Sequence, residues 1–221
     1  MLPTVLAQYE QEIWLAISQT FIMVGVSILA AVFIGLPIGT FIYLTRKGQL
    51  LQNKLAYTTL NLFVNTVRSF PFLLLVVFLI PFTRLIVGSA YGTAAACVPM
   101  AIIAIAHYAR LAEQSLLDVP KGVIEAALSM GASVKQVIFK FLYVEARSGL
   151  ILGLTTSTIS FISYSTIMGV VGGGGIGDFA IRYGYQQFKT DLMMYMIFIM
   201  IIFVQCIQLF GTMLAKKLDK R

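Results

Sequence analysis

Charged side chains are scarce in this sequence. Only 11% of its 221 residues are Asp, Glu, Lys or Arg, whereas 59% are hydrophobic. This composition excludes an ordinary soluble domain, and a mean hydropathy of +0.90 indicates that most of the chain lies in lipid. No internal repeat, low-complexity tract or soluble domain interrupts the apolar segments, so we expect one membrane domain over residues 1–221.

Cysteine and histidine are nearly absent, which limits metal and disulfide chemistry. Cys97 and Cys206 lie in apolar runs, where small core residues are expected rather than a disulfide framework. His107 has no second ligand candidate nearby, so hydrogen-bonded packing is favoured over metal binding. We therefore predict no metal site and no cofactor. The N-terminus has no Lys or Arg and its first apolar run is long, so no cleavable signal peptide is expected.

Motifs for nucleotide binding are missing as well. The pattern G-x-x-x-x-G-K-[ST] does not occur, so this chain cannot itself cradle ATP. The run Gly172–Gly177 formally fits G-x-G-x-x-G, but no strand–turn–helix context surrounds it. A flexible turn at a helix end is the favoured interpretation. We predict no catalytic residue and no enzymatic activity in this chain.

Long apolar segments dominate what is present and predict an all-α membrane protein. Five segments are long enough to cross a hydrocarbon core of about 30 Å, at residues 13–45, 56–82, 93–113, 148–170 and 192–214. The first is overlong, and Gly35–Pro37 is expected to bend it or to mark where it leaves the lipid. Pro71 and Pro81 predict kinks in the second.

The distribution of Lys and Arg predicts the orientation. With the N-terminus outside, only Arg84, Arg182 and Lys189 face outward, and Arg68 lies within the second span. The remaining twelve then face the cytoplasm: Arg46, Lys47, Lys54, Arg110, Lys121, Lys135, Lys140, Arg147, Lys216, Lys217, Lys220 and Arg221. This asymmetry satisfies the positive-inside rule, so the C-terminus is expected in the cytoplasm. The net charge of +7 therefore reflects orientation in the membrane rather than binding of nucleic acid.

One stretch between the spans, residues 119–144, has the pattern of a soluble helical hairpin. Pro120 suits the first turn of a short helix, and Gly131 can adopt the positive φ that ends one. Ser133 followed by Gln136 forms a capping-box pattern for a second helix that runs to about Val144. An amphipathic connection resting on the membrane is one interpretation. A DNA-binding helix-turn-helix is another, which the flanking apolar segments disfavour.

The hairpin resembles the cytoplasmic EAA loop of ATP-binding cassette (ABC) importer permeases. In that family the loop forms a coupling helix that docks in a groove of the ATPase subunit. The resemblance implies that ATPase coupling is carried by Glu125, Ala126, Ala127, Gly131 and Ala132. The family usually carries a leucine–proline pair and a later proline, where this chain has Tyr143–Val144 and Ser148.

Residues 65–99, NTVRSFPFLLLVVFLIPFTRLIVGSAYGTAAACVP, resemble the methionine-type ABC importer permeases, in which similar Arg-Ser-x-Pro-Phe and Ile-Pro-Phe-Thr-Arg patterns recur. Tyr164–Ser165 and Tyr183–Tyr185 fit the same family. The resemblance implies a homodimer of five-helix subunits in a prokaryotic inner membrane. It also implies two ATPase subunits and a lipid-anchored or periplasmic methionine-binding protein.

Several polar and bulky residues within the spans are candidates for the transport path. Arg68 is expected to face a cavity or partner, or to snorkel toward the cytoplasmic headgroups. In the hydroxyl-rich fourth span the path candidates are Ser160, Ser163 and Ser165, although small residues also permit close helix packing. Ile167 and Met168 follow as candidates for a hydrophobic gate.

The predicted function is ATP-driven import of methionine by alternating access. A permease for another small solute, such as glycine betaine, stays an alternative because glycine-rich runs occur in osmoprotectant permeases too. A secondary transporter would place carboxylates in its spans, whereas Glu113, Asp118, Glu125 and Glu145 are expected at or beyond the cytoplasmic edge. A receptor or assembly factor without transport activity is a third class.

The charge distribution makes the orientation testable in intact cells. In a background with Cys97 and Cys206 replaced, Gln8→Cys and Lys189→Cys should react with an impermeant thiol reagent added from outside. Lys121→Cys should react only after the cells are opened. Labelling of Lys121→Cys from outside would overturn both the orientation and the docking role of the hairpin.

Overall fold

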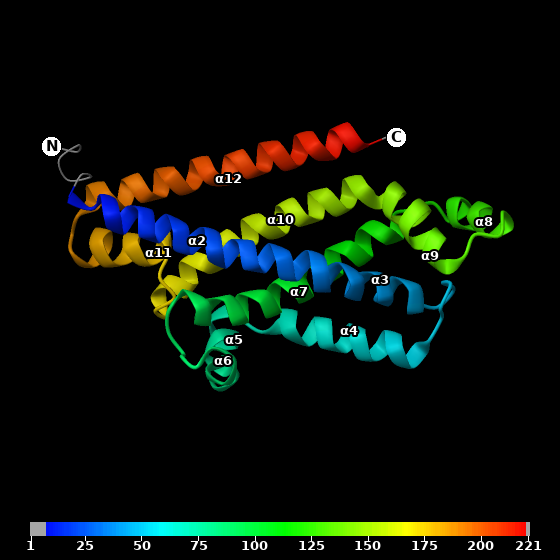
Figure 1. Ribbon diagram of the computed structural model, residues 1–221, viewed down its shortest axis with the longest axis horizontal. Helices are drawn as coiled ribbons and strands as arrows, with labels where there is room; N and C mark the ends of the chain where they lie inside the picture. The colour runs from blue at the N-terminus through cyan, green and yellow to red at the C-terminus, as the bar shows by residue number, and fades with distance from the viewer. Residues whose placement is uncertain (1–7, 220–221) are drawn as a thin grey trace.

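The computed structural model describes residues 8–219, and all regular structure in that range is helical. The long helices run side by side in an elongated bundle (Figure 1). The start of α2 (Glu10–Ala30) lies at one end of the bundle, and α8 (Lys121–Ser129) projects from the other. The prediction of an all-α membrane fold is confirmed.

The first helical run continues without a break through the expected bend. It comprises α2, the π-helical turn η1 (Ala31–Gly35) and α3 (Leu36–Thr45). Pro37 lacks an N–H, and its ring crowds the carbonyl four residues earlier. The wide π turn that ends at Gly35 accommodates both the missing hydrogen bond and the crowding. At 1.5 Å per residue the run is about 54 Å long, so it must tilt or project beyond the hydrocarbon.

Two glycines allow this first run to lie unusually close to α7 (Thr93–Leu117). A Cβ added at Gly39 would lie 2.3 Å from the carbonyl oxygen of Ala109. A Cβ added at Gly35 would lie 2.9 Å from the carbonyl oxygen of Ile105. Gly25, in the same run, has no such neighbour within 4 Å. Small residues at helix contacts let membrane helices pack through their backbones, so glycine is required at the first two positions.

The kinks expected at Pro71 and Pro81 are breaks that divide residues 56–82. Helix α4 (Lys54–Ser69) and α5 (Phe72–Phe78) meet at an angle of 106°. Phe70, which precedes Pro71, is extended with ψ 131°, because proline excludes its predecessor from the helical region. Helix α6 (Ile80–Val87) carries Pro81 in its first turn.

Helix α7 occupies the middle of the bundle, against the first helical run, α4 and α10 (Tyr143–Val170) (Figure 1). Its buried face joins one core cluster that includes Met23, Val64, Met100 and Phe161. The helix extends to Leu117, beyond the predicted limit at residue 113.

The second helix of the predicted hairpin does not stop near Val144. Helix α9 (Val134–Gln136) leads through the π turn η2 (Val137–Leu142) directly into α10. No proline stands at Tyr143–Val144 or Ser148 to interrupt the hydrogen bonding, so the helix is continuous there. The chain ends with α11 (Ile176–Phe179), η3 (Ala180–Gln186) and α12 (Thr190–Leu218).

Three helical runs among residues 8–219 are long and apolar enough to span a membrane, at 10–45, 93–117 and 190–218. The bent pair α4–α5 would make a fourth. Helix α10 is not among these runs, and it carries many Ser and Thr side chains. The count of five spans therefore stays a prediction.

Candidate functional site

The hairpin at the end of the bundle has the local geometry expected from its sequence. Gly131 has φ +77°, and its N–H donates to the carbonyl of Leu128 at 2.9 Å. Ser133 caps the next helix: its N–H donates to the Gln136 side chain at 2.8 Å, and its hydroxyl accepts from the Gln136 N–H. Pro120 lies immediately before α8 rather than inside it.

The two faces of α8 separate packing residues from residues that a partner can reach. Ile124 and Ala127 are buried in a cluster with residues of α7 and η2. Glu125 and Ala126 are exposed. Ala127 therefore packs α8 onto the bundle, although the sequence grouped it with the docking residues.

Gly131 and Ala132 form the turn after α8, and two apolar side chains beside it were missed by the sequence analysis. Leu128 is 43% exposed and Met130 is 70% exposed. The available signal was their position within the three residues before Gly131, close to the tip of the hairpin.

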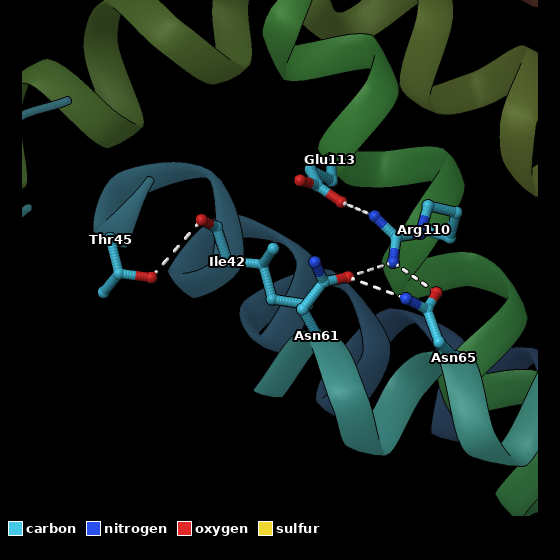
Figure 2. A network of polar contacts seen from close by, with 6 residues as sticks. All are labelled: Ile42, Thr45, Asn61, Asn65, Arg110 and Glu113. Atoms are coloured by element: carbon cyan, nitrogen blue, oxygen red, sulfur yellow. Dashed lines mark hydrogen bonds and ion pairs between the residues drawn. The ribbon is translucent and has the colours of Figure 1, made fainter. Parts of the chain in front are cut away.

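A polar network between α4 and α7 was also missed (Figure 2). The Arg110 guanidinium donates to the Glu113 carboxylate on its own helix and to the amide oxygens of Asn61 and Asn65 on α4. The bond to Asn65 is 2.6 Å long, and the Asn65 amide donates to the Asn61 oxygen at 3.2 Å. Glu113 is almost completely buried, with 2% of its side chain exposed.

The network lies toward the C-terminal end of α7. Because α7 continues to Leu117, both Arg110 and Glu113 lie inside this helix. The sequence signals were an Arg–Glu pair at i,i+3 on α7 and an Asn pair at i,i+4 on α4.

Arg68 itself lies on α4, one turn beyond Asn65, and its side chain is exposed. Within residues 8–219 it has no hydrogen-bonded or ion-paired partner. Thr66 and Ser69 are exposed on the same part of α4, so this stretch presents polar surface outward from the subunit.

The three serine candidates of α10 have different surroundings. Each hydroxyl donates to a carbonyl of its own helix: Ser160 to Thr156, Ser163 to Ile159 and Ser165 to Ile162. Ser165 is buried inside the subunit, whereas Ser163 is exposed. Ser163 also lines a groove of about 360 Å³ between α10, α11 and α12.

The two gate candidates also differ in their burial. Met168 is 3% exposed and belongs to the core cluster, and its carbonyl accepts from the N–H of Gly173 at 2.8 Å. Ile167 is only partly buried. Of the pair, Ile167 is the residue whose side chain keeps some exposed surface.

The glycine run after α10 is a packed junction rather than the flexible turn expected. Gln19 and Thr20 of α2 accept hydrogen bonds from the N–H groups of Gly175 and Ile176, at 2.8 and 2.9 Å. Gly174 has φ +76°, and a Cβ there would lie 2.4 Å from the Gln19 oxygen. The glycines are therefore needed for close approach and for positive φ.

These features define a helical membrane protein with an exposed hairpin at one end. Residues 27–221 match the family described as "Binding-protein-dependent transport system inner membrane component", and the chain belongs to that family. It is a transport subunit and not an enzyme, because ATP hydrolysis in such importers belongs to a separate subunit. The resemblance to the ABC importer permeases is thus confirmed.

The chain is similar to named relatives over most of its length. It is 43% identical to "Probable D-methionine transport system permease protein MetI" of Vibrio cholerae, over 92% of this chain and 90% of that one. It is 40% identical to "Methionine import system permease protein MetP" of Bacillus subtilis, over 95% of both.

A solved structure matches the fold closely. It is a chain of the MetNI methionine ABC transporter in inward-facing conformations, with a TM-score of 0.93 and 37% identity. The match covers 96% of this chain and 99% of that one. An amino acid ABC transporter solved with histidines, at 17% identity and a TM-score of 0.76, shares the fold.

Proposed function

We propose that this chain is the inner-membrane permease subunit of an ATP-driven ABC importer for methionine. The observation that carries the proposal is the match, over nearly the full chain, to the MetNI methionine transporter at 37% identity. Two relatives at 40% identity or more, whose names specify methionine, support the same substrate.

The importer would contain two copies of this chain, two ATPase subunits and a methionine-binding protein. The N-terminus would lie outside, the C-terminus inside, and lipid would surround the dimer. The distribution of Lys and Arg supports this orientation by the positive-inside rule. The same orientation places the hairpin where a cytoplasmic ATPase can bind. The exposed side chains of Glu125, Leu128 and Met130 supply a surface for docking.

The exposed hairpin is an argument for a mechanism of alternating access. Closure of the ATPases on ATP would draw the two hairpins together, and the dimer halves would then rock between inward-open and outward-open states. The path would run between subunits, because five helices rarely enclose a route for an amino acid. Arg68, Ser160 and Ser163 would face it, with Ser165 supporting it from the core.

The alternatives have less support. The matched relatives name methionine, which disfavours glycine betaine as the substrate. A secondary transporter needs a carboxylate in its spans that can bind and release ions. Glu113 does lie within a helix, but it is held by Arg110.

Uptake by the reconstituted importer tests the substrate. Vesicles containing this permease, its ATPase and its binding protein should accumulate radiolabelled methionine only when ATP is supplied. Excess unlabelled methionine should abolish the signal, whereas unlabelled glycine betaine should leave it unchanged. ATP-dependent accumulation of radiolabelled glycine betaine, with none of methionine, would assign the osmoprotectant instead.

The docking role predicts that the hairpin can be uncoupled without loss of the membrane domain. Gly131→Val should cost about 1–2 kcal/mol because Gly131 has φ +77°, and it should misdirect α8. Glu125→Lys should weaken ATPase retention by reversing a charge on the docked face. Both variants should reach the membrane but lose uptake, measured together with the ATPase that co-purifies.

Two matched variants serve as controls for the hairpin. Gly25→Val introduces the same side chain where a Cβ has no neighbour within 4 Å, and Glu125→Gln keeps the side-chain size. Normal uptake by both Gly131→Val and Glu125→Lys would show that the hairpin is only a surface connection.

The gate prediction can be divided between its two residues. Ile167→Ala should raise the leak of methionine from vesicles without ATP, because it removes bulk from a hydrophobic constriction. Met168→Ala should instead destabilise the subunit by about 2–5 kcal/mol, because it opens a cavity in the core. Leak and thermal unfolding of the purified permease distinguish the two, and an unchanged leak in Ile167→Ala would place the gate elsewhere.

A further inference from the structure

The docking hairpin and α7 are joined as one packed body. Helix α7 ends at Leu117, and α8 begins at Lys121. Leu116, Val119 and Ile124 pack with Val137 and Leu142 in a single apolar cluster. A movement imposed on α8 therefore reaches α7 through side-chain contact as well as through the short connection.

Helix α3 is attached to this body, but α4 takes no part in its cluster. Tyr43 and Leu44 of α3 belong to the cluster, and the Thr40 hydroxyl is 2.8 Å from the Tyr143 hydroxyl. Within the described chain α4 contributes no residue to it.

Helix α4 packs on the bundle through Val64 and Val67 in the other core cluster. The backbone N–H of its N-cap residue, Asn53, donates a hydrogen bond to the carbonyl of Thr45 on α3. Its side-chain hydrogen bonds to α7 are those of the Arg110 network (Figure 2).

The network is difficult to open. The planar guanidinium satisfies two amide oxygens of α4 and one buried carboxylate of α7 at the same time. Moving α4 away from α7 would remove two acceptors from Arg110, whose side chain is 16% exposed, although Asn65 itself lies at the surface. Hydrogen bonds from a charged donor are stronger than neutral ones, so the network favours joint movement of the two helices.

We propose that Arg110 and Glu113 are positioning residues that make α4 move together with the coupling hairpin. This inference rests on the proposed transport function. Its consequence is that the outward-facing polar surface of α4, with Thr66, Arg68 and Ser69, follows the ATPase stroke. Glu113 fixes the direction of the guanidinium, and the amide oxygens of Asn61 and Asn65 accept its hydrogen bonds.

A double variant, Asn61→Leu with Asn65→Leu, removes the α4 acceptors and leaves the Arg110–Glu113 pair intact. In reconstituted vesicles the complex should assemble and hydrolyse ATP, while methionine imported per ATP falls at least about fivefold. Thr58→Leu is the matched control, because Thr58 is exposed one turn away on α4 and makes no hydrogen bond within residues 8–219. Its ratio should equal that of the unmodified complex.

Moving the carboxylate from α7 to α4 by substitution provides a rescue experiment. Simple loss of stability would not predict such a rescue. Glu113→Gln should lower the same ratio, because Arg110 loses the carboxylate that orients it. Adding Asn61→Asp to Glu113→Gln places a carboxylate on α4 against the same guanidinium. The combined variant should recover the ratio above that of Glu113→Gln alone.

The outcomes separate this inference from the proposed function. A wild-type complex that imports no methionine would overturn the substrate assignment, and the ratio would then be measured with the solute that it does import. An unchanged ratio in the double variant, or a parallel fall in uptake and ATP hydrolysis, would overturn the positioning role. If the double variant does not assemble, Asn65→Ala alone decides, with a lowered ratio expected and an unchanged ratio contradicting the proposal.

Discussion

Backbone N–H and C=O groups in lipid have no water to bind, and the arrangement of this subunit depends on satisfying them internally. The long helices do so within themselves. Where the regular pattern changes, the structure supplies a local solution: the π turn η1 before Pro37, and side chains of α2 that accept from the glycine junction. The irregular segments are thus the places where distant parts of the chain are fastened together.

The fastening is concentrated on α7. Glycines of the first helical run bring that run into backbone contact with α7, and the Arg110 network holds α4 against it. The hairpin follows directly from its end. In the proposed mechanism movement passes from the hairpin to the path, and α7 would then be the central element to which its neighbours are attached by different interactions.

Much of the hairpin could be predicted from the sequence because its signals are local. A glycine that needs positive φ and a serine–glutamine capping box depend on only a few neighbouring residues, and both are present as expected. The division of α8 into two faces was less accessible. Ala127 and Leu128 are both apolar, and only the packing of the surrounding helices decides that the first is buried and the second exposed.

The Arg110 network shows the opposite case. In sequence, an Arg–Glu pair three residues apart near a helix end is typical of a solvated surface. Its buried state depends on how far α7 extends and on which side chains of α4 meet it, and neither follows from local pattern. The continuity of the helix past Val144 was missed because the hairpin and the fourth apolar segment, residues 148–170, were interpreted as separate elements.

The uninterrupted helix from Val134 to Val170 gives the subunit a stiff rod about 55 Å long at 1.5 Å per residue. One end carries the hairpin turn and the other leads into the glycine junction. If the hairpin docks an ATPase as proposed, a twist applied there would be carried to the far end within the same element. The wide turn η2, next to the docking end, is where its hydrogen-bond register changes, so compliance in the rod would be concentrated there.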